Sequence, residues 1–361
     1  MKIQCESCQS EYPDDGMPYR CPSCGGLYDF DGPFPINSTN LVASGTSLWQ
    51  YQDSFGLPMD RIPVSMGEGK TPLLLRQWQG IQLGFKMESY NPSGSYKDRG
   101  TTLLATELQA RGISAVVEDS SGNAGASLAT YCSWADIDCR IFVPTSASGA
   151  KISQIRRSNA RLEMVPGARE NASLAVVEAV NNEAAVYASH AYSPFTLPGI
   201  ATIAYELFQS LGKAPGTVLA PVGHGGLFLG IMRGFDALFK QQIISQMPTF
   251  VGVQAAGYHP LVTHFHANFR QEIDESIETL AEGVRIQQPS RFNQILAMCD
   301  NLNFDFVACT NDELEKALPE LWRMGLYVEM TSALVWAAYR KFQRKLPEPI
   351  VFILTGSGLK Y

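Results

Sequence analysis

Short apolar runs alternate with longer helix-patterned stretches along most of the chain. The apolar runs are typical of buried strands and occupy residues 115–118, 140–144, 161–165, 217–221, 249–254 and 350–354. Helical patterns cover 124–134, a segment from about Lys151, and 168–181. Apolar strands that alternate with helices are typical of parallel sheets covered on both faces. The sequence therefore predicts an α/β fold with doubly wound sheets, in which ligands bind at the carboxyl ends of the strands.

The composition is that of an ordinary globular chain, with 45% apolar and 17% charged residues. Its 361 residues can bury the cores of two domains. The net charge of −7 argues against nucleic acid or an anionic membrane as the main partner. No signal-peptide pattern and no apolar run of membrane-spanning length occurs. We expect a cytoplasmic protein with a small-molecule partner, no nucleic-acid partner and no membrane partner.

Four of the eight cysteines lie near the N-terminus as two pairs, Cys5-x2-Cys8 and Cys21-x2-Cys24. Each pair can place two thiolates on one side of a tight turn, and two such turns form the tetrahedral four-sulfur cage that Zn²⁺ prefers. Because four protein ligands leave no open coordination position, the zinc is expected to be structural. Two disulfides or four free thiols are the alternatives, and they fit a reducing cytoplasm poorly.

The first polar loop carries a lysine where a strand gives way to a helix. It reads Asn91-Pro-Ser-Gly-Ser-Tyr-Lys97-Asp-Arg-Gly, after an expected strand at 85–89 and before an expected helix at 101–111. The positive end of a helix dipole lowers the pKa of a nearby lysine, which helps the neutral amine attack a carbonyl. The alternative is an ordinary solvated lysine beside Asp98 and Arg99.

Three further loops follow strands of the predicted sheets. Residues 119–125 expose backbone N–H groups at the start of a helix, where a carboxylate or phosphate binds readily. A helix cap at Ser120 or Ser121 would explain only one of the polar residues there. The glycine-rich stretch 221–230 lacks the lysine of a Walker A loop and suits a lone phosphate. The turn at 354–358 carries a threonine hydroxyl that can face a ring nitrogen.

Taken together and in this order, these loops resemble those of the fold-type II pyridoxal-phosphate enzymes, and most closely the threonine synthases. The resemblance covers essentially the whole chain and implies two doubly wound domains of the tryptophan synthase beta-like kind. The lysine motif at 91–100 is highly specific for the superfamily, with Tyr96 where phenylalanine is usual. Some relatives also begin with a zinc ribbon. The other matching blocks are Glu68-Gly-Lys-Thr-Pro-Leu73, Glu282-Gly283, Glu329-Met-Thr-Ser-Ala333 and Leu354-Thr-Gly-Ser-Gly-Leu-Lys360.

The resemblance implies a role for each loop. Lys97, the expected catalytic residue, would form a Schiff base with pyridoxal phosphate and then move protons at Cα and Cβ. Asn123 would bond the phenolic oxygen of the cofactor, and Thr355 would meet its pyridine nitrogen. The substrate carboxylate would be held by Ser120, Ser121 and Ala124. The cofactor phosphate would be held by Gly223, His224, Gly225, Gly226 and Leu227.

The chain departs from the threonine synthases at two places. Its phosphate loop is closer to that of serine and threonine dehydratases than to the Gly-Asn-Ala-Gly-Asn loop of the threonine synthases. The stretch 193–197 lacks the arginine that helps threonine synthases hold the phosphate of phosphohomoserine. A buried phosphate dianion without such a partner would be costly. The cations that would replace it, each more often a surface charge or a satisfied histidine, are Lys70, Lys151, Arg156, Arg157, Arg169 and His190.

The expected organisation has three parts. Residues 1–30 form the zinc ribbon, 31–100 and 202–361 the large cofactor-binding domain, and 101–201 a smaller α/β domain with the asparagine loop. Residues 30–48 are rich in Gly, Pro, Ser and Asn, and are expected to be a linker. The family is commonly dimeric, so we expect a homodimer.

The expected function is that of a pyridoxal-phosphate-dependent lyase that acts on a small amino acid, with or without a phosphate group, by β- or γ-elimination or replacement. The best candidate is threonine synthase, which converts O-phosphohomoserine and water to threonine and phosphate. The alternatives are a cysteate synthase-like β-replacement enzyme and a serine/threonine ammonia-lyase. A non-catalytic zinc-mediated binding protein is disfavoured because Lys97, Asn123 and Thr355 are all present.

Overall fold

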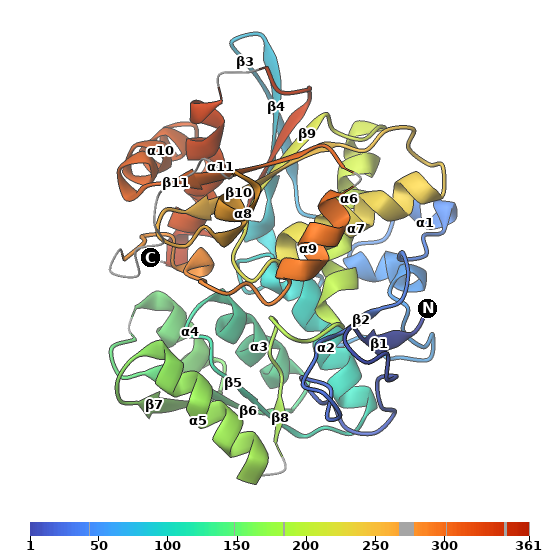
Figure 1. Ribbon diagram of the computed structural model, residues 1–361, viewed down its shortest axis with the longest axis vertical. Helices are drawn as coiled ribbons and strands as arrows, with labels where there is room; N and C mark the ends of the chain where they lie inside the picture. The colour runs from blue at the N-terminus through green and yellow to red at the C-terminus, as the bar shows by residue number, and fades with distance from the viewer. Residues whose placement is uncertain are drawn as a thin grey trace.

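The computed structural model describes residues 1–42, 44–147, 149–182, 185–266, 278–300, 302–342 and 345–360. These residues form two lobes, drawn one above the other in Figure 1, and each lobe is built around a sheet. The large sheet has the strand order β11-β10-β9-β12-β4-β3, and the small sheet has the order β7-β6-β5-β8. The predicted α/β fold is confirmed.

The strands of the large sheet are β3 (Leu73–Trp78), β4 (Ile81–Met87), β9 (Thr217–Pro221), β10 (Thr249–Ala255), β11 (Phe304–Cys309) and β12 (Ile350–Leu354). Those of the small sheet are β5 (Ala115–Glu118), β6 (Asp138–Pro144), β7 (Arg161–Val165) and β8 (Val186–Tyr187). The helices are α1 (Ser38–Val42), α2 (Lys97–Ala110), α3 (Asn123–Trp134), α4 (Ala150–Arg157), α5 (Arg169–Asn182), α6 (Thr196–Leu211), α7 (Gly226–Lys240), α8 (Pro260–Phe265), α9 (Phe292–Cys299), α10 (Asn311–Arg323) and α11 (Met330–Lys341).

The large sheet is not wholly parallel, because its edge strand β3 pairs antiparallel with β4. The two strands are joined directly through Gln79 and Gly80, whose φ angles are 49° and 80°. Two successive residues with positive φ are the mark of a tight hairpin turn whose twist matches that of the strands. The antiparallel edge therefore follows from local turn chemistry that the apolar pattern did not register.

Strand β12 shows why the large sheet carries helices on both faces. All five of its residues are buried. Val351 and Ile353 belong to the core that contains α6 and α7, whereas Ile350, Phe352 and Leu354 belong to the core that contains α10 and α11. Successive side chains of a strand point to opposite faces, so an unbroken apolar run needs cover on both.

The two predicted domain boundaries, at 100/101 and 201/202, fall inside helices α2 and α6. These helices cross closely, since a Cβ added at Gly199 would lie 1.9 Å from the carbonyl oxygen of Arg99. All four strands of the small sheet lie within 101–201, and the strands of the large sheet lie on both sides of that range. The boundaries themselves stay predictions.

The prediction that residues 30–48 form a linker is wrong. Its apolar residues Phe34, Ile36, Leu41 and Leu48 are all buried in the core of the large lobe, and α1 lies within the segment. The polar and turn-forming residues of the segment suggested a linker, but the apolar residues between them pack against the large lobe.

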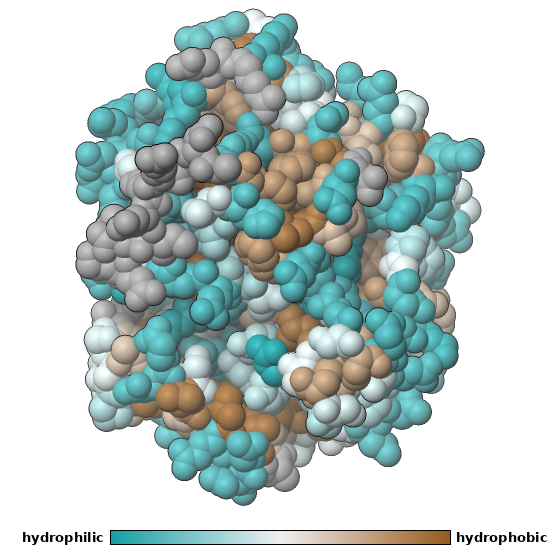
Figure 2. Space-filling view, viewed as in Figure 1, coloured by the Kyte–Doolittle hydropathy of each residue, from teal (hydrophilic) through white to brown (hydrophobic). Residues whose placement is uncertain are grey.

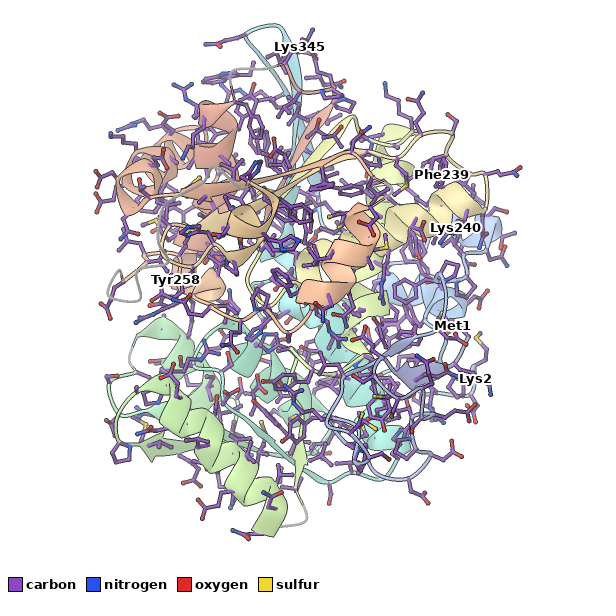
Figure 3. The ribbon with its side chains drawn as sticks, viewed as in Figure 1. Met1, Lys2, Phe239, Lys240, Tyr258 and Lys345 are labelled. Carbon is purple, nitrogen blue, oxygen red and sulfur yellow. The ribbon has the colours of Figure 1, made fainter. Side chains whose placement is uncertain are left out.

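The N-terminal residues form a small antiparallel ribbon, β1 (Ile3–Cys5) and β2 (Tyr28–Phe30). Met1 and Lys2 mark its position at the side of the molecule, at the level where the lobes meet (Figure 3). On the face shown in Figure 2, hydrophobic patches are interrupted by hydrophilic side chains. Among the described residues, no helix combines the length and apolarity that a membrane crossing requires.

Candidate functional site

The four predicted loops each follow the carboxyl end of a strand. The Lys97 loop comes after β4, the Asn123 loop after β5, the glycine-rich loop after β9 and the Thr355 turn after β12. The first and last are bonded directly, because the backbone N–H of Tyr96 donates to the carbonyl of Thr355 at 3.0 Å. The lysine is thereby held beside the turn that was predicted to meet the cofactor ring.

Lys97 is the first residue of α2 and is partly buried. The pKa of its amine is lowered from 10.5 to about 7, mainly by burial. Arg169 contributes to the decrease, while Glu118 and Glu329 oppose it. The direction agrees with the expectation from sequence, but burial rather than the helix dipole is the main cause. An amine with this pKa is substantially neutral near pH 7 and is a competent nucleophile.

The other charged residues of the lysine motif hold the loop itself. Arg99 is fully buried and donates to Glu88 at 2.6 Å and to Glu206 at 2.7 Å. The carboxylate of Asp98 accepts the backbone N–H of Ser93 at 2.6 Å. Because its charged neighbours are engaged in these bonds, Lys97 is the charged residue of the motif that remains for chemistry.

Glu329 lies between the two residues predicted to contact the cofactor ring. Its carboxylate is 2% exposed and accepts bonds from the amide of Asn123 at 2.9 and 3.0 Å and from the hydroxyl of Thr355 at 3.0 Å. The ammonium of Lys360 donates to Asn123 Oδ1 at 3.3 Å. Sequence reasoning assigned no role to Glu329 or Lys360. The only signal for them was their presence in blocks that resemble the family.

The residues predicted to hold the substrate carboxylate lie on the turn that begins α3. Ser120 and Ala124 are buried and Ser121 is partly exposed. First-turn N–H groups of a helix have no acceptor within it, so they are available to an anion. The turn is tight, since a Cβ added at Gly125 would lie 1.9 Å from the carbonyl oxygen of Ser120. Only glycine permits this approach.

The predicted phosphate cradle, Gly223 to Leu227, opens helix α7. Gly225 has a φ of 97°, a left-handed conformation that favours glycine. Gly226 begins the helix, and a Cβ added to it would meet nothing within 4 Å. A helix start with open space in front of it fits an anion such as a phosphate.

Four buried polar atoms around these loops have no hydrogen-bond partner among the described residues. They are Ser95 Oγ, Glu118 Oε2, Ser193 Oγ and His224 Nδ1. Burial lowers the pKa of His224 to about 3, so its ring is neutral at physiological pH. Buried polar atoms are nearly always bonded, so these four atoms are candidates for contact with a polar ligand. Together with the cradle, they fit a phosphorylated cofactor and an amino acid.

A family model described as "Pyridoxal-phosphate dependent enzyme" matches residues 64–356. The chain belongs to the family of pyridoxal-phosphate-dependent enzymes. The predicted family, the enzyme class and the pyridoxal-phosphate cofactor are thereby confirmed.

Relatives of this pyridoxal-phosphate enzyme include threonine synthases. The chain is 31% identical to the threonine synthase of Methanosarcina acetivorans in an alignment 375 residues long. The alignment covers 99% of this chain and 92% of the relative. It is 32% identical to the threonine synthase of Methanocaldococcus jannaschii in an alignment 378 residues long. This alignment covers 100% of this chain and 93% of the relative. The predicted resemblance to threonine synthases is confirmed.

Solved structures share the fold of this pyridoxal-phosphate enzyme. The processed form of threonine deaminase isoform 2 from Solanum lycopersicum superposes with a TM-score of 0.70 at 21% identity, over 96% of this chain and 94% of that one. Maize serine racemase superposes with a TM-score of 0.68 at 20% identity, over 80% and 88%. The predicted fold-type II architecture is confirmed.

Of the six cations proposed to replace the missing arginine, three lie at the site of this pyridoxal-phosphate enzyme. Lys151 Nζ is 3.8 Å from Glu329 Oε2. Arg169 begins α5 and interacts electrostatically with Lys97. His190 Nδ1 is 3.2 Å from Glu118 Oε1. The remaining three lie elsewhere: Lys70 donates to Gln209, and Arg156 and Arg157 are exposed at the end of α4.

The four N-terminal cysteines form the one cluster of potential metal ligands found within the described part of the chain. The sulfur atoms of Cys5, Cys8, Cys21 and Cys24 all lie within 4.8 Å of one another. Cys5 Sγ is 3.4 Å from Cys24 Sγ, and Cys8 Sγ is 3.6 Å from Cys21 Sγ. These separations are close to the edge of about 3.8 Å in a tetrahedron of zinc–sulfur bonds of about 2.3 Å. No disulfide joins these four cysteines in the described part of the chain, and the zinc stays a prediction.

Proposed function

We propose that this chain is a lyase that acts as a threonine synthase, converting O-phosphohomoserine and water to threonine and phosphate. The observation that carries the proposal is its similarity to two threonine synthases over 99% and 100% of its length. The lowered pKa of Lys97 supports it, because the chemistry requires an amine that is neutral near physiological pH.

Bound pyridoxal phosphate would supply an electron-accepting ring that stabilises negative charge on the carbon that loses a proton. The chain's own groups do the rest. Asn123, Thr355 and the Gly223–Leu227 cradle would orient the ring, and the turn at Ser120 would fix the substrate carboxylate. Lys97 would remove and return protons, as the only amine of its motif and one with a pKa near 7.

A serine/threonine ammonia-lyase is the second candidate. It is favoured by the glycine-rich loop at 223–227, which is closer to that of serine and threonine dehydratases, and by the stretch 193–197, which contains no arginine. No guanidinium from this stretch serves a substrate phosphate. Cations for a substrate phosphate would have to come from Lys151 and Arg169 instead.

The test is to supply the holoenzyme with O-phosphohomoserine and measure phosphate and threonine together. Equal amounts of both support the proposal. Keto acid and ammonia formed from serine or threonine, without phosphate release from O-phosphohomoserine, select the second candidate. Borohydride reduction followed by peptide mass analysis should locate the cofactor on Lys97, and the Lys97→Ala variant should carry none.

We also propose that the four-cysteine cluster binds a structural Zn²⁺. The support is the distance set of the four sulfurs and the preference of this metal for tetrahedral thiolates. A content of one zinc per chain, lost in the Cys8→Ser variant, would bear this out. The homodimer and the cytoplasmic location stay predictions.

A further inference from the structure

Glu118 is a buried carboxyl group with half of its bonding capacity unused. It is the last residue of β5 and is 1% exposed. Its Oε1 lies 3.2 Å from Nδ1 of His190, and its Oε2 has no partner among the described residues. Because leaving a buried polar atom unbonded is costly, this oxygen is placed to meet a ligand.

The position of Glu118 connects it to the reacting groups. It stands directly before Asp119 and Ser120, at the start of the turn predicted to hold the substrate carboxylate. It is also the carboxyl group with the strongest electrostatic effect on Lys97, ahead of Glu329. The neighbouring Asp119 is engaged elsewhere, since it accepts the hydroxyl of Tyr187 at 2.8 Å.

The environment of Glu118 favours the protonated form of its carboxyl group. Burial raises its pKa well above the ordinary value, and Asp119 adds to the rise. Burial also lowers the pKa of His190 well below its ordinary value, so the imidazole is neutral. The pair therefore holds one carboxyl proton beside a neutral ring that can donate from or accept at Nδ1. The charged and titratable groups that face Glu118 are Lys97, Asp119, Cys139, Arg169 and His190.

We propose that Glu118, oriented by His190, donates a proton to the oxygen that leaves the side chain of the bound amino acid. The substrate class is an amino acid with a carbon–oxygen bond at Cβ or Cγ, as in a hydroxyl group or a phosphate ester. The inference rests on the proposed function, because it assumes an elimination step at Lys97.

The step is balanced in atoms and electrons and involves no oxidation. Lys97 takes a proton from the carbon next to the one that bears the oxygen, and that C–H pair becomes the new C=C bond. The carbon–oxygen bond breaks with its pair on the oxygen, which takes the proton of Glu118. The resulting carboxylate accepts a bond from His190 Nδ1–H. If water then adds, its oxygen bonds to one carbon of the double bond and its proton returns to Glu118. The electron pair of the double bond takes back the proton held by Lys97, which restores both groups.

The experiment compares leaving groups in the holoenzyme of the Glu118→Gln variant. The oxygen substrate is whichever of O-phosphohomoserine, serine or threonine the wild type converts, so failure with O-phosphohomoserine counts against the proposed function alone. The comparison substrate is the chlorinated amino acid of the same chain length, because chloride leaves without a proton. We expect kcat for the oxygen substrate to fall by about 10²–10⁴-fold. The chloride substrate should react at close to the wild-type rate.

Two further readouts separate proton donation from a structural role. The variant should keep the absorbance of the bound cofactor and should still exchange the Cα proton of the amino acid with deuterium oxide. The Glu163→Gln variant is the matched control, since Glu163 is an exposed carboxylate on β7 of the same lobe. Equal losses with both leaving groups, or an unchanged rate with oxygen, would overturn the proposal.

A measurement on the wild type covers the case in which Glu118→Gln does not fold. The donor must be protonated, and burial raises its pKa well above the ordinary value, so it keeps its proton to higher pH than an ordinary glutamate and loses it as pH rises. The rate with the oxygen substrate should therefore fall at high pH relative to the rate with the chloride substrate. Parallel pH profiles for the two substrates would contradict the assignment.

Discussion

At the scale of single residues, the pKa of Lys97 makes the capture of the cofactor depend on pH. Burial holds this pKa at about 7, so the amine gains a proton as pH falls through that value. Only the neutral amine attacks a carbonyl. Rapid mixing of the apoenzyme with pyridoxal phosphate should therefore show a capture rate that rises up to about pH 7 and then levels off.

Pyridoxal phosphate itself changes protonation in this range, so Nα-acetyl-lysine amide, whose ε-amine is its one reactive amine, is the control in the same buffers. Its rate should keep rising toward pH 10.5, the ordinary value for lysine. A capture rate in the enzyme that follows the control would mean that Lys97 is not desolvated as the structure shows.

Arg99 provides a second prediction at this scale, because it is fully buried between two carboxylates. Its Nε donates to Glu88, its Nη1 donates to Glu206, and its Nη2 donates to both. Lys86 also donates to Glu206. A lysine cannot reproduce the planar fork of the guanidinium. The substitution would keep the positive charge but leave carboxylate oxygens without their hydrogen bonds, and a buried polar atom left unpaired costs about 1–3 kcal/mol.

We therefore expect Arg99→Lys to lower the free energy of unfolding by an amount near that range, as measured by urea denaturation. Arg340→Lys is the matched control, since Arg340 is exposed at the end of α11 and its replacement should cost no more than about 0.5 kcal/mol. Similar effects of the two substitutions would show that the buried network is not a support of the lysine loop.

At the scale of the elements, two glycines at helix starts should respond in opposite ways to the same change. A Cβ at Gly125 would collide with the carbonyl of Ser120, whereas a Cβ at Gly226 would meet nothing within 4 Å. Gly125→Ala should therefore destabilise the apoprotein by at least about 1–3 kcal/mol. Gly226→Ala should leave its stability unchanged or slightly higher, because alanine favours a helix more than glycine.

For binding of pyridoxal phosphate, in contrast to stability, Gly226→Ala is expected to be harmful. The new methyl group of Gly226→Ala would fill the space in front of α7 that we assign to the phosphate. The Kd for pyridoxal phosphate should rise by at least about tenfold, or about 1.4 kcal/mol. Thermal melting of the apoprotein and absorbance titration measure the two effects separately. Unchanged cofactor affinity would place the phosphate elsewhere.

At the scale of the whole molecule, Arg291 connects the N-terminal ribbon to the site. The side chain is 1% exposed and donates to the carbonyls of Tyr28 at 3.1 Å and Tyr192 at 2.8 Å. Its backbone N–H donates to the carbonyl of His224 in the phosphate cradle at 3.0 Å. One residue thus joins the ribbon, the loop before α6 and the cradle.

Removal of the proposed zinc should therefore act beyond the ribbon. A chelator is expected to lower the thermal midpoint and to weaken cofactor binding, while the folded enzyme keeps the absorbance of its bound cofactor. In the Arg291→Met variant the cofactor affinity should respond less to the chelator, since the connection is absent. An equal response in both proteins would show that the ribbon acts by another route.

The sequence by itself determined the features that are local. Apolar runs placed β5, β9 and β12 within a residue of their positions, because a strand buried on both faces must be apolar throughout. The run at 161–165 also placed β7, although none of its residues is fully buried. The Lys97 motif, the turn at 119–125 and the glycine-rich stretch identified the family. Each needs small residues or turn formers at fixed spacing, and those are visible in one short segment.

Tertiary structure alone decided which distant groups meet. It buried the expected linker and placed Glu329 between Asn123 and Thr355. It also set His190 against Glu118, 72 residues apart in the chain. Such contacts depend on how helices and sheets pack, and an isolated glutamate or histidine carries no periodic signal. The proton-donor assignment for Glu118 therefore comes from tertiary packing within the small lobe rather than from any motif.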